Sequence, residues 1–341
     1  MKHRNLFAAL KSLAIFFLIY IMLSFTVVML IYEGLFVRSE EYEYSVFISD
    51  KHLAQNYKTE EVTFESRGFI LNGILFGDKE DKLVILGHGK GGSFKDMLPE
   101  AEYFLENNFS VLAFDFTGHN KSGGNSQYGL QQSVYDMENA VNYAKNLGYK
   151  DIYLYGIGIG GYAAAACADC DGVRGVAAIS AFSSVSDMTL EYATENMSVL
   201  GYLEYPIMML YQFMTYGSDV NESAVKGINS SDVPVVVIHG TADEEVNFDG
   251  AALINAADRI TNPDVSYVTV EGGLHLSLMR SDAAIDAINS FNEKAYEIYN
   301  QYSGEVPVAE IEAVYASVDT EVTSELDDDI MNKVMEVFNA G

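Results

Sequence analysis

The chain has 341 residues, of which 49% are hydrophobic and 20% charged, and this composition excludes a globally disordered or fibrous protein. Its 49 acidic and 20 basic residues give a formal net charge of −29, which repels phosphate backbones, so we expect no nucleic-acid partner. Two cysteines are too few for a disulfide scaffold or a zinc finger.

The first predicted element is a membrane-spanning helix over residues 12–32, which carry no charge in 21 positions. Such a helix rises about 31 Å, enough to cross the hydrocarbon core of a bilayer. Lys2, Arg4 and Lys11 precede the span and acidic residues follow it, so the positive-inside rule places residues 1–11 in the cytoplasm and the remainder outside it. The absence of a small-residue cleavage motif after the span favours a single-pass signal anchor over a cleaved export signal.

After an acidic stalk over residues 33–59, the pattern predicts an α/β domain over residues 60–302. Residues 60–76 alternate like two antiparallel strands around a turn at Arg67 and Gly68. Helical spacing in the later gaps, and a closing helix over about residues 281–302, predict a mostly parallel, doubly wound sheet. The apolar runs that predict its other strands are 83–86, 111–114, 152–155, 173–179, 235–238 and 265–270.

Two segments stand outside this alternation. Residues 182–232 interrupt it and include an apolar stretch rich in methionine and tyrosine at 197–217. Flexible methionine and amphipathic tyrosine suit an adaptable pocket wall, so we predict a helical cap here instead of additional core. Residues 303–341 form an acidic tail, in which Ser324 and Asp327 resemble a helix start and an apolar face predicts a short appended amphipathic helix.

Five segments at predicted strand ends, where α/β sheets place ligands, carry glycine, histidine or acidic residues. They are HGKGGS (88–93), FDFTGHNKSGG (114–124), YGIGIGGY (155–162), HGTADEEV (239–246) and GGLHL (272–276). In this order, over residues 60–302, they resemble the α/β-hydrolase superfamily. The likeness is closest to its serine aminopeptidase, monoacylglycerol-lipase and dienelactone-hydrolase-like branches, which include membrane-anchored members.

The resemblance implies roles for four residues. Asp243 occupies the position of the triad acid and His275 that of the triad base, in the family's chain order. The loop HGKGGS would supply one donor of an oxyanion hole through the Lys90 amide, and the amide of Ile159 would supply the other. His119 and Lys121 depart from the family's pattern in the second segment.

The nucleophile position departs most. The family's G-x-S-x-G elbow reads Gly156-Ile157-Gly158-Ile159-Gly160 here, so residue 158 has no side chain. No acyl-enzyme forms at such a position, and His275 has no serine proton to accept. Glycine adopts the strained backbone geometry of an elbow almost freely, so the substitution leaves the fold intact.

Other nucleophiles are poor substitutes for the missing serine. Cys167 and Cys170 lie on the order of 13–18 Å along the following helix. Ser93 and Ser122 lie in loops that do not form an elbow beside the base. A water molecule deprotonated by His275 is the better alternative, because enzymes that lack a triad member retain roughly 10³–10⁴-fold catalysis over water.

Two further motifs have structural explanations. Gly156, Gly158 and Gly161 satisfy the dinucleotide fingerprint, but neither the internal strand nor the short following helix fits that motif. The C-x-x-C pair at Cys167 and Cys170 falls late in a helix, which favours buried thiols or a local disulfide over a redox site. We expect His88 and His239 to be structural and predict neither a metal nor a cofactor.

The sequence therefore leaves two functions open. One is a membrane-anchored hydrolase of an ester, acylglycerol or peptide-like substrate, with weak or absent activity because of Gly158. The other is a pseudohydrolase that uses its pocket for binding or interaction outside the cytoplasm. Both predict a small-molecule or lipid-like substrate or ligand, and both use residues 12–32 as the membrane contact.

Overall fold

The computed structural model describes residues 2–78, 80–302 and 305–341. Residue 1, which begins the predicted cytoplasmic segment, and residues 303–304, which begin the predicted tail, lie outside the described residues, as does residue 79. The side chains of Lys2 and Arg4, two of the cations predicted to precede the membrane span, also lie outside the description.

An eight-stranded sheet in the order β1-β2-β4-β3-β5-β6-β7-β8 forms the centre of the fold. The pairs β1–β2 and β2–β4 are antiparallel, and every other pair of neighbouring strands is parallel. The sequence pattern predicted this mostly parallel sheet with an antiparallel start. The strands span β1 Thr59–Ser66, β2 Phe69–Phe76, β3 Lys82–Gly87, β4 Ser110–Phe114, β5 Asp151–Ile157, β6 Val173–Ile179, β7 Val235–Gly240 and β8 Val265–Val270. The central strands are continuous apolar runs because helices cover both of their faces.

Helices pack on the two faces of the sheet and enclose two apolar cores. One face carries α4 (Gln132–Asn146), α5 (Ile159–Ala166) and α8 (Ala224–Asn229), and the other carries α3 (Leu98–Glu106) and α12 (Asp328–Ala340). The predicted fold class, an α/β-hydrolase sheet with a helical insertion and an N-terminal apolar helix, is confirmed. The remaining short elements are α2 Asp50–Leu53, α11 Thr320–Thr323, η1 Phe94–Met97, η2 Ser198–Leu200, η3 Gly217–Asn221 and η4 Ile254–Arg259.

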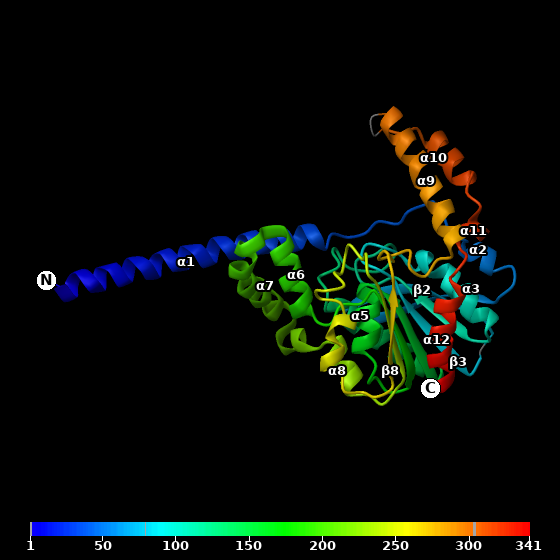
Figure 1. The fold of residues 1–341 in the computed structure, drawn as a ribbon, viewed down its shortest axis with the longest axis horizontal. Helices are drawn as coiled ribbons and strands as arrows, with labels where there is room; N and C mark the ends of the chain where they lie inside the picture. The colour runs from blue at the N-terminus through cyan, green and yellow to red at the C-terminus, as the bar shows by residue number, and fades with distance from the viewer. Residues whose placement is uncertain (1, 79, 303–304) are drawn as a thin grey trace.

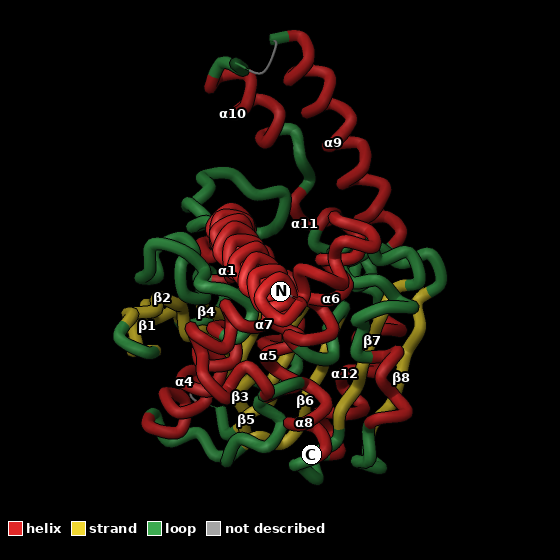
Figure 2. The backbone as a smooth tube through the Cα atoms, turned by 90° about the vertical axis from the view of Figure 1, so that its left-hand side faces the viewer, coloured by secondary structure: helices red, strands yellow, loops and turns green. Residues whose placement is uncertain are grey.

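The insertion between β6 and β7 contains α6 (Val185–Met197) and α7 (Gly201–Tyr216), and these lie beside α1 (Lys2–Leu35) in both Figure 1 and Figure 2. The Tyr211 ring of α7 lies 5.9 Å from the Phe25 ring and 5.0 Å from the Tyr32 ring. Helix α1 is long and apolar enough to cross a membrane over Asn5–Leu35, but its last turns are covered by protein. Part of the predicted span is thus a packing surface for the insertion.

The segment predicted as a stalk is bonded to the domain along its length. The Arg38 guanidinium donates to the carbonyls of Ser122 and Gly124 at 2.9 and 2.6 Å, and also to that of Asn120. The Ser39 hydroxyl donates to the Gly91 carbonyl at 2.8 Å. These bonds fix the residues after α1 against the loops that follow β3 and β4.

The predicted roles of the C-terminal helices require correction. Helix α9 (Asp282–Gln301), expected to close the fold, projects from the domain beside α10 (Val308–Ala316) in Figure 1, and of its residues only Ala284 is buried. Helix α12, expected as an appendage beyond residue 302, begins at the Asp327 cap and packs on β6 and β7. The apolar side of α12 packs against these strands and buries apolar sheet surface that would otherwise be exposed to water.

Phe338 shows how α12 completes the core. Its ring is fully buried and lies 5.5 Å from the Phe104 ring and 5.0 Å from the Tyr153 ring. We expect Phe338→Ala to lower the free energy of unfolding by about 3–5 kcal/mol, because it leaves a cavity in the core. Urea unfolding of the full chain in detergent measures this. The control Val308→Ala, at an exposed tail position, should change stability little, and equal losses in both variants would contradict a core role for α12.

Candidate active site

A cavity of about 400 Å³ lies where the insertion, the end of α1 and the carboxyl ends of the strands meet. Four of the five predicted site residues line it: Lys90, Gly158, Ile159 and His275. Tyr32 and Leu35 of α1 and Phe36, the residue after it, contribute to its walls. The insertion contributes Met188, Thr189 and Met208. The sequence predicted a pocket under the insertion, but not that the N-terminal helix would form part of its wall.

The turn from β5 into α5 has the geometry of a nucleophile elbow. Gly158 has φ 58° and ψ −117°, in the region that side chains rarely adopt, and its N–H donates to the Ile179 carbonyl at 2.9 Å. A Cβ at Gly160 would lie 2.1 Å from the Gly87 carbonyl oxygen, so only glycine allows α5 to approach β3 this closely.

His275 and Asp243 form a hydrogen-bonded pair at the edge of the cavity. The imidazole Nδ1 lies 2.9 Å from each carboxylate oxygen of Asp243. The backbone N–H groups of Glu245 and Val246 also donate to this carboxylate, both at 2.9 Å. The geometry orients the imidazole so that its Nε2 is free to face the elbow, as in a triad.

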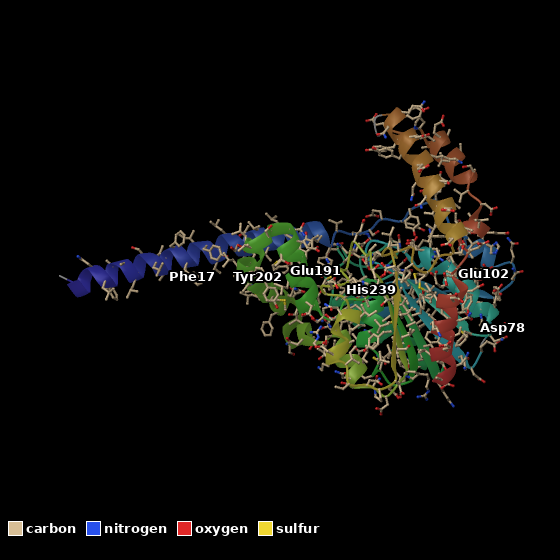
Figure 3. The ribbon with its side chains drawn as sticks, viewed as in Figure 1. Phe17, Asp78, Glu102, Glu191, Tyr202 and His239 are labelled. Atoms are coloured by element: carbon tan, nitrogen blue, oxygen red, sulfur yellow. The ribbon has the colours of Figure 1, made fainter. Side chains whose placement is uncertain are left out.

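His239, which we expected to be structural, lies beside Asp243 and is labelled in Figure 3. It is fully buried, and its Nε2 lies 3.1 Å from Asp243 Oδ2 and 3.0 Å from the Val246 carbonyl. Burial alone would raise the pKa of Asp243, but the hydrogen bonds from His239 and His275 outweigh it and hold that pKa well below its usual range. No clear signal of this contact was present in the sequence, because four residues of spacing do not determine the path of the loop between them.

The imidazole of His275 occupies the space in which a side chain at residue 158 would begin. An ideal Cβ built on Gly158 would lie 2.7 Å from His275 Nε2. Carbon and nitrogen atoms in van der Waals contact are farther apart, so a serine here would require the imidazole to move outward. Glu245 approaches the same nitrogen from the cavity side, at 3.8 Å.

Lys90 and Ile159, whose backbone N–H groups are expected to form an oxyanion hole, both line the cavity. Among the described residues, neither N–H takes part in a turn, loop or side-chain hydrogen bond. The next N–H along the loop, that of Gly91, donates to His119 Nε2 at 3.2 Å. His119, a departure from the family pattern, thereby fixes the loop that carries Lys90.

The serines considered as alternative nucleophiles are buried and serve as hydrogen-bonding groups. Ser93 Oγ donates to the Asp115 carboxylate at 3.1 Å, and Ser122 Oγ donates to the Asp115 carbonyl at 2.6 Å. Neither lines the cavity. Burial raises the pKa of Asp115 to about 6, against the opposing effect of these and other hydrogen bonds.

The remaining candidates also serve the structure. His88 is fully buried and accepts a hydrogen bond from the Phe116 N–H at 3.1 Å, and burial lowers its pKa well below the usual value. Cys167 and Cys170 are free thiols at the end of α5, so the predicted alternative of a local disulfide is not adopted. Among the described residues, no group of three or more histidine, cysteine or acidic side chains is placed to hold a metal ion.

Comparisons with known proteins agree with this geometry. Residues 78–204 match the model of the family described as Serine aminopeptidase, S33. The sheet, the elbow and the solved structures below show that the chain has the α/β-hydrolase fold, and the family match lies within it. The uncharacterized protein YfhR of Salmonella typhi is 27% identical over 249 residues, which cover 68% of this chain and 82% of that protein.

Solved structures share the fold at low sequence identity. The esterase Pf2001 of Pyrococcus furiosus superposes with a TM-score of 0.55 at 20% identity, covering 78% of this chain and 98% of that one. An α/β hydrolase from Vibrio vulnificus gives a TM-score of 0.55 at 17% identity, covering 79% of this chain and 92% of that one.

The buried His119 predicts a pH dependence of stability. Burial lowers its pKa to about 4 in the folded chain, against about 6.5 when unfolded, so the unfolded state binds more protons between these values. The stabilising contribution of the neutral imidazole is complete above pH 6.5 and is lost as the pH falls to 4. We expect the stability difference between the wild type and His119→Gln to shrink by up to about 3 kcal/mol over this window. Urea unfolding at a series of pH values tests this, and parallel pH profiles for the two proteins would contradict it.

Proposed function

We propose that this protein is a membrane-anchored α/β-hydrolase-fold protein that binds an acyl compound, an ester or a peptide-like molecule, without forming an acyl-enzyme. The observation that carries the proposal is the contact between His275 Nε2 and the elbow, where an ideal Cβ would lie only 2.7 Å from the ring nitrogen. The imidazole of His275 lies where a side chain at residue 158 would begin, so the site as it stands has no room for a nucleophile, and a serine would require this ring to move outward. This supports a binding pocket more than a slow enzyme.

The chemistry of the cavity supports a ligand with an apolar chain and an uncharged polar group. Its walls are mostly apolar, with Leu35, Phe36 and Met208 among them. Glu195, Glu244 and Glu245 also line it, and together with the net charge of −29 they disfavour an anionic ligand. The free N–H groups of Lys90 and Ile159 are suited to hold a carbonyl oxygen.

The structure also supports retention of the N-terminal helix as an anchor. Cleavage after the apolar span would remove Tyr32 and open the cavity wall that it forms with Leu35 and Phe36. We therefore propose a single-pass anchor, with the N-terminus in the cytoplasm and the hydrolase-like domain outside it, as the charges flanking the span predict. The triad acid Asp243 and the base His275 then belong to a pocket held at the membrane.

A second candidate function rests on the intact pair of Asp243 and His275. The pair has the geometry of a general base, and the Asp243 carboxylate remains ionised at neutral pH. Water activated by His275 beside the two N–H donors would hydrolyse an ester slowly, at the level that triads without a nucleophile retain.

The full chain in nanodiscs, with its cavity wall intact, is the protein to assay. We would compare the native protein with Gly158→Ser, Gly158→Ala and His275→Ala, using a fluorescent acyl ester and a fluorophosphonate probe. Gly158→Ala is the matched control, because it introduces the same Cβ and the same backbone strain of about 1–3 kcal/mol without a hydroxyl.

We expect the native protein to bind the ester saturably without turnover and to resist the fluorophosphonate. Gly158→Ser should become labelled and hydrolyse the ester about a hundredfold faster or more, because it regains a nucleophile, while Gly158→Ala should do neither. If the native protein hydrolyses the ester and His275→Ala abolishes this activity, the proposed binding function is wrong and hydrolysis by water activated at His275 replaces it. Failure of the native protein to bind the ester would contradict both.

A further inference from the structure

An apolar surface at the end of the insertion has no protein partner among the described residues. It is formed by Val199, Leu200, Tyr202 and Leu203, which are 78%, 63%, 63% and 60% exposed, and we call these four residues the cap tip. They lie in and after η2, at the junction of α6 and α7. Contiguous exposed apolar residues of this size are typical of surfaces that contact another molecule or a membrane.

The cap tip lies at the level of the apolar N-terminal helix. The Tyr20 hydroxyl of α1 donates to Glu204 Oε1 at 3.1 Å and lies 3.5 Å from the Leu203 carbonyl. The Ser24 hydroxyl donates to the same Glu204 oxygen at 3.0 Å. Figure 3 shows Tyr202 at the side of the domain from which α1 extends, toward Phe17. The start of α7 is therefore fixed beside Tyr20–Ser24 of α1.

Two segments of α1 could span the bilayer, and with either of them the cap tip lies in contact with lipid. If the span is residues 12–32, the cap tip lies within the hydrocarbon core, because Tyr20 and Ser24 are near the middle of that span. If the span is instead the stretch that the insertion leaves uncovered, residues 5–23, its 19 residues rise about 28 Å and the cap tip lies at the lipid interface. The long side chain of Lys11 then extends toward the headgroups at the N-terminal end of the span.

Charge favours lipid as the occupant over a second protein of similar composition. Residues 197–217 contain a single charged residue, Glu204, although the whole chain carries a net charge of −29. That one carboxylate accepts hydrogen bonds from α1 instead of facing outward. The end of the insertion is thus uncharged where the remaining surface is strongly acidic, which is the division expected for a part inserted in a bilayer.

We infer that the cap tip inserts into the lipid leaflet next to α1, so that α1 and the insertion contact the bilayer as one body. The attachment is apolar, since residues 197–217 include no lysine or arginine, and it requires no anionic lipid. This contact is independent of whether the neighbouring cavity binds an acyl compound.

The chain contains no tryptophan, so a single introduced tryptophan reports its own surroundings. We would reconstitute the full chain in phosphatidylcholine vesicles as Leu200→Trp, with Tyr202→Trp as a second probe of the cap tip. Phe16→Trp, on the exposed part of α1, is the lipid reference, and Tyr296→Trp is the water reference, because Tyr296 is 68% exposed on the projecting α9. Quenching by phosphatidylcholine with brominated acyl chains and by aqueous acrylamide is measured for each.

We expect Leu200→Trp and Tyr202→Trp to give blue-shifted emission, with several-fold stronger quenching by brominated lipid than Tyr296→Trp and weaker quenching by acrylamide. The result should not change with salt or with added anionic lipid. Acrylamide quenching equal to that of Tyr296→Trp would overturn the inference. Protection from both quenchers would overturn it too, because it would mean that protein, such as a second copy of the chain, covers the cap tip.

Discussion

The close approach of α5 to three strands is the constraint on which the site depends. Added Cβ atoms at Gly156 and Gly161 would lie 2.3 Å and 2.7 Å from backbone atoms of α5 and β6, and one at Gly160 would meet β3. Because no side chain fits in these places, the helix begins directly against the sheet, and residue 158 is raised on the turn with the Ile159 N–H beside it. None of this geometry requires a hydroxyl at residue 158, so a glycine there is compatible with the pocket.

The second organising feature is that the N-terminal helix is part of the domain. Tyr32 and Phe36 line the cavity, Lys90 extends toward the Phe36 ring at 5.4 Å, and Arg38 binds the loop after β4. Burial lowers the pKa of Lys90, with Glu245 acting in the opposite direction. A protein truncated after this helix would therefore lose a wall of its pocket as well as the proposed membrane anchor, so binding is best measured on the full chain.

The strands and the position of the site could be predicted from sequence because both depend on local patterns. Alternation marked β1 and β2, and apolar runs between turn residues marked the other six strands. Asp243 and His275 lie in the loops after β7 and β8, where a parallel sheet brings its loops together. The partners of helices could not be predicted in the same way. Helices α9 and α12 are both amphipathic, but only α12 meets the sheet, because a hydrophobic face does not specify which surface it covers.

The partner of α1 could not be predicted from its sequence either. An uncharged, apolar run is suited both to contact with lipid and to packing against another apolar helix. The pairing of α1 with α7 depends on Glu204 and on the aromatic ring of Tyr211, and neither gives a signal in the sequence of α1 itself. The contact between His239 and Asp243 was not predicted for a related reason. It arises from the path of the loop after β7, which residue spacing alone does not determine.

The hydrogen bonds of Arg38 and Ser39 have a consequence for how the protein meets other molecules. A domain on a free tether rotates and samples the solution in all directions, but here the segment after α1 is fixed to the loops around the pocket. In the anchored state that we propose, the domain therefore keeps one orientation to the plane of the membrane. Its encounters are then set by lateral diffusion in two dimensions, and the relevant concentration of any lipid-dissolved compound is its surface density near the anchor.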